Sequence, residues 1–322
     1  ENTLAACLHS VRDAVDEIVI VDTGSSDGTK ATASRFTDKI FDFEWIDDFA
    51  AARNYAYEQA TMDYILWLDA DDVVLPGDIE KLMRLKEELS PAVDAVRMKY
   101  NTLFDADGNV LFSYYRERLT RRGCGFRWRE PVHEVLEIWG NVINIDICIT
   151  HTKRHCALSD RNLKIYEGIL ARGKTLSPRG TYYYARELST HKRYAEAVRV
   201  FNRFLDEGKG WREDNITACG ELAKCLLQLH EDEKALAAML RSFQFDKPRP
   251  ELCCQIGYFF KNRNAYELAV FWFSLVLGLE ETKEPLGFVQ HDCRGYIPCI
   301  ECAVCYDRLG DYVLAEHYNM KA

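Results

Sequence analysis

The C-terminal half of the chain repeats one spacing of small residues. Four times, an alanine follows another small residue at a distance of twelve positions. The earlier residues are Ala185, Ala223, Gly257 and Ala303, and the later ones are Ala197, Ala235, Ala269 and Ala315. The segments around them have helical patterns. A periodicity of this kind predicts stacked helical units, each of which packs against its neighbours.

The distance between repeats narrows the class of helical unit. The step from Ala235 to Ala269 is 34 residues, and the other two steps are 38 and 46 residues. Three of the four repeats have a tyrosine three positions before the later alanine, namely Tyr194, Tyr266 and Tyr312. From about residue 180 to the end, this pattern resembles a short tetratricopeptide array with an insertion around residues 280–298. The resemblance implies a concave surface that binds a protein or peptide, or that forms a homodimer.

The same register assigns a role to several of the twelve cysteines. Cys219, Cys253 and Cys299 each stand four residues before the small residue of a repeat, where an apolar side chain packs. The spacing of Cys299, Cys302 and Cys305 is also typical of a zinc or iron–sulfur site. Because a buried cysteine behaves as a small hydrophobe, we interpret these residues as reduced core thiols. Reduced thiols indicate a cytoplasmic protein.

Composition argues against two classes of function. The net charge of −10 and the pI near 5.4 leave no basic stripe for nucleic-acid phosphates, so no nucleic-acid partner is expected. The longest apolar run, residues 269–279, is shorter than the roughly 20 residues that span a bilayer, so no transmembrane segment is expected. The chain begins in a helical pattern without a leading strand, and we expect that the first strand of the domain is missing.

Up to about residue 155, helical and strand-like segments alternate. Strands are expected at residues 18–21, 40–45 and 64–68, helices at 48–60 and 78–89, and a hairpin turn at 105–109. This alternation predicts an α/β domain whose mixed, largely parallel sheet has helices on both faces. We therefore place one domain at residues 1–155 and a helical repeat domain at 156–322, with His155 in the linker.

The stretch IVIVDTGSSDGT, residues 18–29, ends a strand in Asp22 and turns into a helix. Open α/β sheets bind nucleotides at the carboxyl ends of their strands, where an aspartate accepts hydrogen bonds from a base or a ribose. The alternative is a plain strand-to-helix turn capped by Asp27. No Gly-rich dinucleotide or P-loop motif is present.

The stretch YILWLDADD, residues 64–72, places Asp69, Asp71 and Asp72 at the end of an apolar strand. Carboxylates gathered there repel one another unless a cation or open water compensates them. Asp69 and Asp71 fit one hard divalent cation that also binds phosphate oxygens. The alternative is a loop of solvated acids before the next helix.

Together, VDTGSSDGT, the Arg-Asn helix of residues 48–60 and LDADD resemble the inverting family-two glycosyltransferases of GT-A fold. The resemblance covers residues 1–155 and implies a nucleotide-sugar donor with Mg²⁺ or Mn²⁺ as cofactor. It implies that Asp22 contacts the nucleoside and that Arg53 contacts the nucleotide or its phosphates. It implies that Asp69 contacts the ribose or the metal, and that Asp71 contacts the metal.

The stretch RWREPVHEVL, residues 127–136, lies where that family has its acceptor side. An inverting transfer needs one general base, and Glu134 is our candidate. His133 is a candidate metal ligand or phosphate contact, and the Val-His-Glu triplet is similar to that of bacterial sugar transferases. The alternative is an ordinary His-Glu pair at a helix start. His151, which ends a strand-like run, is a candidate third metal ligand.

The sequence thus predicts a metal-dependent, inverting glycosyltransferase that moves a sugar, by family habit from UDP, to a protein, a peptide or a cell-surface glycan. A nucleotidyltransferase also pairs an α/β nucleotide fold with acidic metal ligands, and remains an alternative. So does a scaffold in which the repeats act and the α/β domain is inactive.

Overall fold

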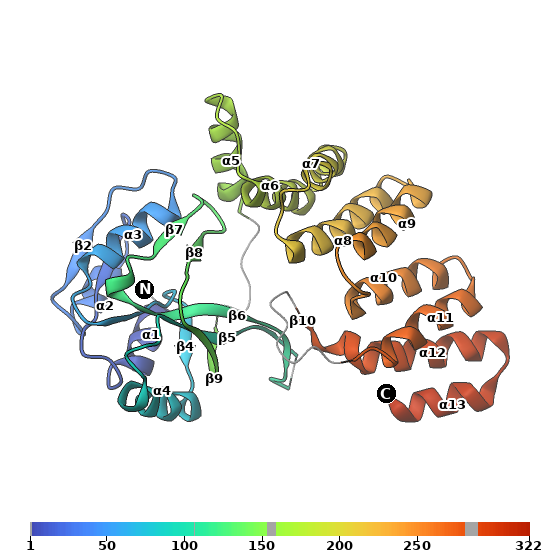
Figure 1. The fold of residues 1–322 in the computed structure, drawn as a ribbon, viewed down its shortest axis with the longest axis horizontal. Helices are drawn as coiled ribbons and strands as arrows, with labels where there is room; N and C mark the ends of the chain where they lie inside the picture. The colour runs from blue at the N-terminus through green and yellow to red at the C-terminus, as the bar shows by residue number, and fades with distance from the viewer. Residues whose placement is uncertain (1, 106, 153–158, 281–288) are drawn as a thin grey trace. The chain divides into compact units, whose positions relative to one another are not determined.

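The computed structural model describes residues 2–105, 107–152, 159–280 and 289–322. Internal contacts divide the chain into two compact units, Glu1–Ser159 and Asp160–Ala322. Figure 1 shows that the first unit combines strands and helices and that the second is built mainly of helices. The predicted boundary between residues 155 and 156 and the linker residue His155 lie outside the described residues.

The first unit alternates helices and strands up to α4 and is mostly strand beyond it. Its helices are α1 (Leu4–Val11), α2 (Thr29–Ala33), α3 (Phe49–Gln59) and α4 (Pro76–Glu88). Its strands are β1 (Ile20–Asp22), β2 (Ile40–Asp42), β3 (Tyr64–Leu66), β4 (Asp72–Val74), β5 (Ala95–Phe104), β6 (Val110–Arg121), β7 (Arg127–Arg129), β8 (Val135–Glu137) and β9 (Val142–His151). The elements expected before residue 90 are present, and helix α3 begins after Asp48, whose carboxylate accepts a hydrogen bond from the Ala51 amide at 2.9 Å.

The sheet of this unit is mixed, as predicted. Strand β3 pairs antiparallel with β6, β6 antiparallel with β5, β5 parallel with β9, and β9 antiparallel with β4. Strands β1 and β2 form a separate parallel pair. The long β5–β6 hairpin, in which the Asp105 amide donates a hydrogen bond to the Asn109 carbonyl, makes the sheet more antiparallel than the alternation of helices and strands indicated. The stretch RWREPVHEVL forms the antiparallel β7–β8 hairpin and not a helix start.

Helices cover both faces of the sheet, which confirms the predicted α/β class. Val96 packs in a core with residues of α1 and α4, whereas its neighbour Ala95 packs with residues of α3 and of the β7–β8 hairpin. Successive residues of a strand point to opposite faces, so these are the two sides of one sheet.

The second unit begins with α5 (Arg161–Ala171) and continues as helical hairpins (Figure 1). The hairpins pair α6 (Pro178–Thr190) with α7 (Tyr194–Glu207), α8 (Arg212–Gln228) with α9 (Asp232–Arg241), α10 (Pro250–Lys261) with α11 (Tyr266–Leu277), and α12 (Tyr296–Leu309) with α13 (Tyr312–Lys321). The predicted tetratricopeptide-like repeat domain is therefore present. Its small residues allow close packing: a Cβ added to Gly257 would lie 2.7 Å from the Phe273 ring.

The cysteines of the repeats are core thiols, as predicted. Cys219, Cys253, Cys299, Cys302 and Cys305 are all free and buried. Burial raises the pKa of Cys219 and Cys253 to about 12, so both are neutral at ordinary pH.

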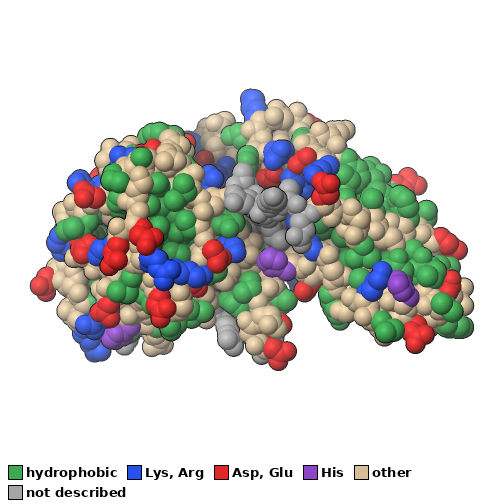
Figure 2. Space-filling view, turned by 60° about the horizontal axis from the view of Figure 1, so that its bottom comes forward, with side chains coloured by type: hydrophobic (Ala, Val, Ile, Leu, Met, Phe, Trp, Pro, Cys, Tyr) green, Lys and Arg blue, Asp and Glu red, His purple; other side chains and the backbone are tan. Residues whose placement is uncertain are grey.

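The last helices carry exposed apolar side chains, which Figure 2 shows as a gathering of hydrophobic groups. They include Leu268, Phe271, Tyr312, Val313 and Met320. Across the residues that the structure describes, we find no helix with the length and apolar character that crossing a bilayer requires.

Candidate active site

Asp22 ends strand β1 and is buried, with 4% of its surface exposed. Its Oδ2 atom accepts hydrogen bonds from the backbone amides of Gly24 at 3.2 Å and Ser25 at 3.0 Å. Gly24 has a φ of 104°, a conformation that other residues adopt at a cost. Burial opposes ionisation of Asp22, but the bonds from Ser25 and Gly24 lower its pKa. The turn therefore fixes an ionised carboxylate at the end of the strand.

Arg53, on α3, connects two carboxylates that are far apart in the sequence. Its Nη2 atom lies 2.5 Å from Oδ1 of Asp69, and its Nε atom lies 2.6 Å from Oε1 of Glu134. Burial opposes ionisation of Asp69, but Arg53 and then Arg118 lower its pKa. These contacts join the end of the β3 segment to the turn between β7 and β8.

Two tryptophans hold the Arg53 guanidinium in place. Its Cζ atom lies 4.8 Å from the Trp67 ring centre and 4.8 Å from the Trp128 ring centre. The two rings meet edge to face, with centroids 4.8 Å apart. Both indoles are buried, so the guanidinium is fixed by aromatic faces as well as by its carboxylates.

Asp71, Asp72 and His151 form a second group beside this clamp. Each offers a ligand atom within 4.8 Å of the others, and among the described residues no other group of His, Cys, Asp and Glu does so. The strand register explains the meeting, because Asp72 on β4 is paired with His151 on β9. The His151 Nδ1 atom lies 3.6 Å from Asp71 Oδ1 and 3.5 Å from Asp72 Oδ1.

The donor set of this group fits a divalent cation such as Mg²⁺ or Mn²⁺, which prefers carboxylate oxygens and tolerates an imidazole. Asp72 is completely buried and has further partners of its own. Arg118 Nη1 donates to its Oδ2 at 2.8 Å, and Tyr100 Oη donates to its Oδ1 at 2.8 Å. Hydrogen bonding to Asp72, with the charges of Asp71 and Asp72, raises the pKa of His151 against the effect of burial. Asp71, whose side chain is 23% exposed, is the more accessible of the two carboxylates.

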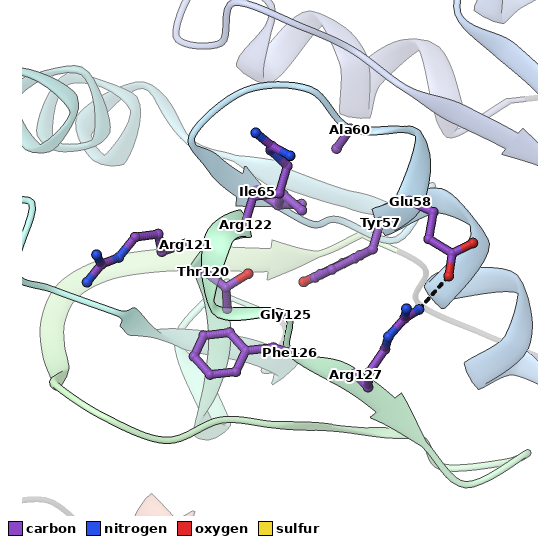
Figure 3. Close-up of a pocket in the computed structure, with 10 residues that line it drawn as sticks. All are labelled: Tyr57, Glu58, Ala60, Ile65, Thr120, Arg121, Arg122, Gly125, Phe126 and Arg127. Carbon is purple, nitrogen blue, oxygen red and sulfur yellow. Dashed lines mark hydrogen bonds and ion pairs between the residues drawn. The ribbon is translucent and has the colours of Figure 1, made fainter.

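A separate hollow of about 190 Å³ lies on α3, β3, β6 and the segment before β7. Figure 3 shows the Tyr57 and Thr120 hydroxyls facing each other in it, with the Glu58–Arg127 ion pair at one side. Tyr57 packs edge to face against Trp128 at 6.0 Å, so the hollow adjoins the tryptophan pair. None of the predicted site residues lines it.

Residues 1–135 match the family model described as Glycosyl transferase family 2. The resemblance predicted from the motifs is thereby confirmed, and the matched region contains Asp22, Arg53, Asp69, Asp71 and Glu134.

Relatives of the chain include glycosyltransferases. A TPR repeat-containing protein of Synechococcus elongatus is 38% identical over 135 residues, which cover 42% of this chain and 32% of that protein. The SPbeta prophage-derived glycosyltransferase SunS of Bacillus subtilis is 25% identical over 269 residues, 79% of this chain and 61% of that protein. The lipopolysaccharide core biosynthesis glycosyltransferase LpsC of Rhizobium meliloti is 31% identical over 156 residues, 45% of this chain and 56% of that protein.

The chain therefore spans between about a third and three-fifths of the length of these relatives. Among solved structures, MamA matches with a TM-score of 0.40 and 12% identity, covering 49% of this chain and 83% of that one. The helical hairpins described above, and not this loose superposition, carry the tetratricopeptide likeness.

In the first unit, the structure brings most of the predicted residues into two groups. Asp69 and Glu134 meet on Arg53, and Asp71 meets His151. The group of possible metal ligands includes Asp72 and does not include Asp69 or His133. His133 lies in the β7–β8 turn with a φ of 53°.

Sequence reasoning did not assign roles to Asp72, Trp67, Trp128 or Arg118. Asp72 could have been predicted as a possible metal ligand, because it is the third carboxylate of the LDADD stretch. The other three are an apolar strand position, a hairpin position and a strand arginine, and no local pattern distinguishes them from ordinary core or surface residues.

Proposed function

We propose that the first unit is an inverting, metal-assisted glycosyltransferase that takes a sugar from a nucleotide-sugar, with UDP as the favoured nucleotide. The observation that carries the proposal is the Arg53 clamp. It joins Asp69, in the acidic stretch that would serve the donor, to Glu134, the candidate base. One guanidinium thus holds both the acidic stretch that would bind the donor and the candidate base that would act on the acceptor. This arrangement fits a reaction in which donor and acceptor bind side by side.

In the proposed reaction, Glu134 accepts the proton of the acceptor group. The acceptor atom forms a bond to the anomeric carbon while the bond from that carbon to the diphosphate oxygen breaks on the opposite face. Arg53 holds one oxygen of the Glu134 carboxylate, so the direction of the other oxygen is fixed. A divalent ion held by Asp71, Asp72 and His151 would supply charge to the leaving diphosphate.

Asp22 would bind the nucleoside, because a fixed, ionised carboxylate at a strand end accepts hydrogen bonds from ribose hydroxyls or a base N–H. His133, next to the base, would contact a phosphate or the acceptor.

The acceptor in this proposal is a protein or peptide, and the helical repeats bind it. The similarity to SunS supports a joint role of both units. The matched segment is 269 residues long and is therefore longer than the first unit, Glu1–Ser159, so it includes part of the helical repeats. A cell-surface glycan is the other acceptor class, supported by the name of LpsC. Buried, free cysteines are in keeping with a cytoplasmic enzyme, and the repeats also offer a surface for a homodimer.

A thermal-shift panel tests the proposal. UDP, GDP and their sugar conjugates are each added with and without Mn²⁺, and the melting temperature is recorded. Ligands that bind the folded state raise it, so we expect one nucleotide class to do so and Mn²⁺ to enlarge the rise. If no nucleoside diphosphate changes the melting temperature in the presence of Mn²⁺, the proposed function is wrong.

A further inference from the structure

Three guanidinium groups surround a single tryptophan in the candidate active site. The Trp67 ring centre lies 4.8 Å from the Cζ atom of Arg53, 4.6 Å from that of Arg116 and 3.9 Å from that of Arg118. Arg116 and Arg118 are two positions apart on β6, and both guanidinium groups reach the same indole ring. A tryptophan ring attracts cations, but three guanidinium groups this close together repel one another and also need negatively charged partners.

Two of the three arginines already have carboxylate partners. Arg53 pairs with Asp69 and Glu134, and Arg118 pairs with Asp72. Arg118 is also completely buried, whereas Arg116 is only partly buried.

Arg116 differs from both. In the described parts of the chain, no carboxylate oxygen lies within 4.0 Å of its guanidinium nitrogens. Its Nη2 atom donates a long hydrogen bond of 3.5 Å to the backbone oxygen of Glu134. Its positive charge also contributes to the lowered pKa of Asp69, which places it near the acidic stretch.

A diphosphate that approaches this centre meets more carboxylates than guanidiniums. The carboxylates are Asp69, Asp71, Asp72 and Glu134, and the guanidiniums are Arg53, Arg116 and Arg118. Arg53 and Arg118 are committed to bonds with these carboxylates, and giving one up leaves a partly buried charge unpaired. Arg116 can bind an anion without breaking an ion pair, and its planar fork suits two phosphate oxygens at once.

We propose that Arg116 is the arginine that binds the diphosphate of the donor and stays on it as it leaves. This inference rests on the proposed glycosyl transfer and adds to it a residue that sequence reasoning did not single out. Arg53 then acts mainly as a positioning residue that orients Asp69 and Glu134. Arg116, whose charge is not matched by a carboxylate, then makes the contact with the phosphates.

The test compares binding of UDP and GDP with binding of uridine and guanosine, in Mn²⁺, by isothermal titration calorimetry. The variant is Arg116→Gln. The matched control is Lys99→Gln, which removes the same charge from the neighbouring strand β5, where Lys99 pairs with Asp146 at 3.0 Å. Charged hydrogen bonds of this kind correspond to about 10- to 100-fold in affinity. We expect Arg116→Gln to weaken nucleoside diphosphate binding by that factor, to leave nucleoside binding unchanged, and Lys99→Gln to change neither.

The outcomes separate the two proposals. If the wild-type protein binds a nucleoside diphosphate and Arg116→Gln binds it equally well, Arg116 has no phosphate role and the glycosyltransferase proposal stands. Equal losses for nucleoside and diphosphate would show a general disturbance of the site and would also overturn the inference. If the wild-type protein binds neither diphosphate, both proposals fail together.

Discussion

The Nε atom of Arg53 lies 2.6 Å from Oε1 of Glu134, a residue 81 positions further along the chain. The same guanidinium contacts Asp69 and lies 4.8 Å from the centre of each of two indole rings. Arg53 is thus the link between the acidic stretch after β3 and the turn between β7 and β8.

The first prediction concerns the energy of this link. In a double-mutant cycle with Arg53→Met and Glu134→Gln, we expect a coupling free energy of about 1–3 kcal/mol, because both side chains are largely shielded from water. The control cycle is Lys99→Met with Asp146→Asn, an exposed pair for which about 0–1 kcal/mol is expected. Urea unfolding measures both. Equal coupling in the two cycles would contradict a structural role for the Arg53 clamp.

The second prediction concerns the base. Glu134→Gln should reduce the transfer rate by about two to four orders of magnitude while nucleotide binding persists, because the amide cannot accept the acceptor's proton. Glu137→Gln, an exposed neighbour paired with Arg129 at 2.8 Å, should leave the rate unchanged. Steady-state kinetics on a sugar-nucleotide donor distinguishes them. An unaltered rate for Glu134→Gln removes this residue from the role.

The third prediction concerns the metal group. Asp71→Ala should abolish metal-dependent hydrolysis of a sugar nucleotide without unfolding the protein, because Asp71 is the partly exposed carboxylate of the group. Even outer-shell partners of metal ligands are worth about 10- to 100-fold, and a ligand should be worth at least as much. Asp146→Ala, an exposed carboxylate, is the control. Near wild-type, Mn²⁺-stimulated turnover by Asp71→Ala would count against the metal assignment.

The fourth prediction concerns the repeats. Gly257→Ala should destabilise the fold by about 1–3 kcal/mol, because the new Cβ would lie 2.7 Å from the buried Phe273 ring. Gly278→Ala is the matched control in the same repeat, because its new Cβ would lie at an ordinary 3.6 Å from the backbone oxygen of Leu275. Chemical denaturation compares the two. Equal stability of both variants would mean that the α10–α11 contact can relax freely.

The fifth prediction concerns a buried carboxylate in α8. Burial raises the pKa of Asp214 to about 6, although Arg179, 3.9 Å away, opposes the shift. The pKa of an unfolded aspartate is about 3.9, so the folded protein should lose stability as the pH rises from about 4 to 6 and should not recover it above.

Asp214→Asn removes this titration. The variant should therefore be more stable than the wild type by roughly 1–3 kcal/mol at pH 7.5, and the difference should shrink towards pH 4. Asp206→Asn, an exposed carboxylate, should show no such trend. Urea unfolding at the two pH values is the measurement, and a pH-independent difference for Asp214→Asn would contradict the shifted pKa.

The sequence by itself determined the two-part organisation, the helical repeats, the buried cysteines and the motifs of the first unit. These properties follow from local periodicity and from residue types at fixed spacing, which a chain carries before it folds. The strand that ends in Asp22 and the helix that carries Arg53 were predictable for this reason.

Only the tertiary structure decided which carboxylate meets which partner. Asp72 meets His151 because β4 pairs with β9, and Glu134 meets Arg53 because the β7–β8 hairpin packs on α3. Likewise, Arg116 and Arg118 are indistinguishable as strand arginines until Trp67 and the neighbouring acids surround them. Strand register and packing across distant segments are set by the whole core, so no local stretch of sequence contains them.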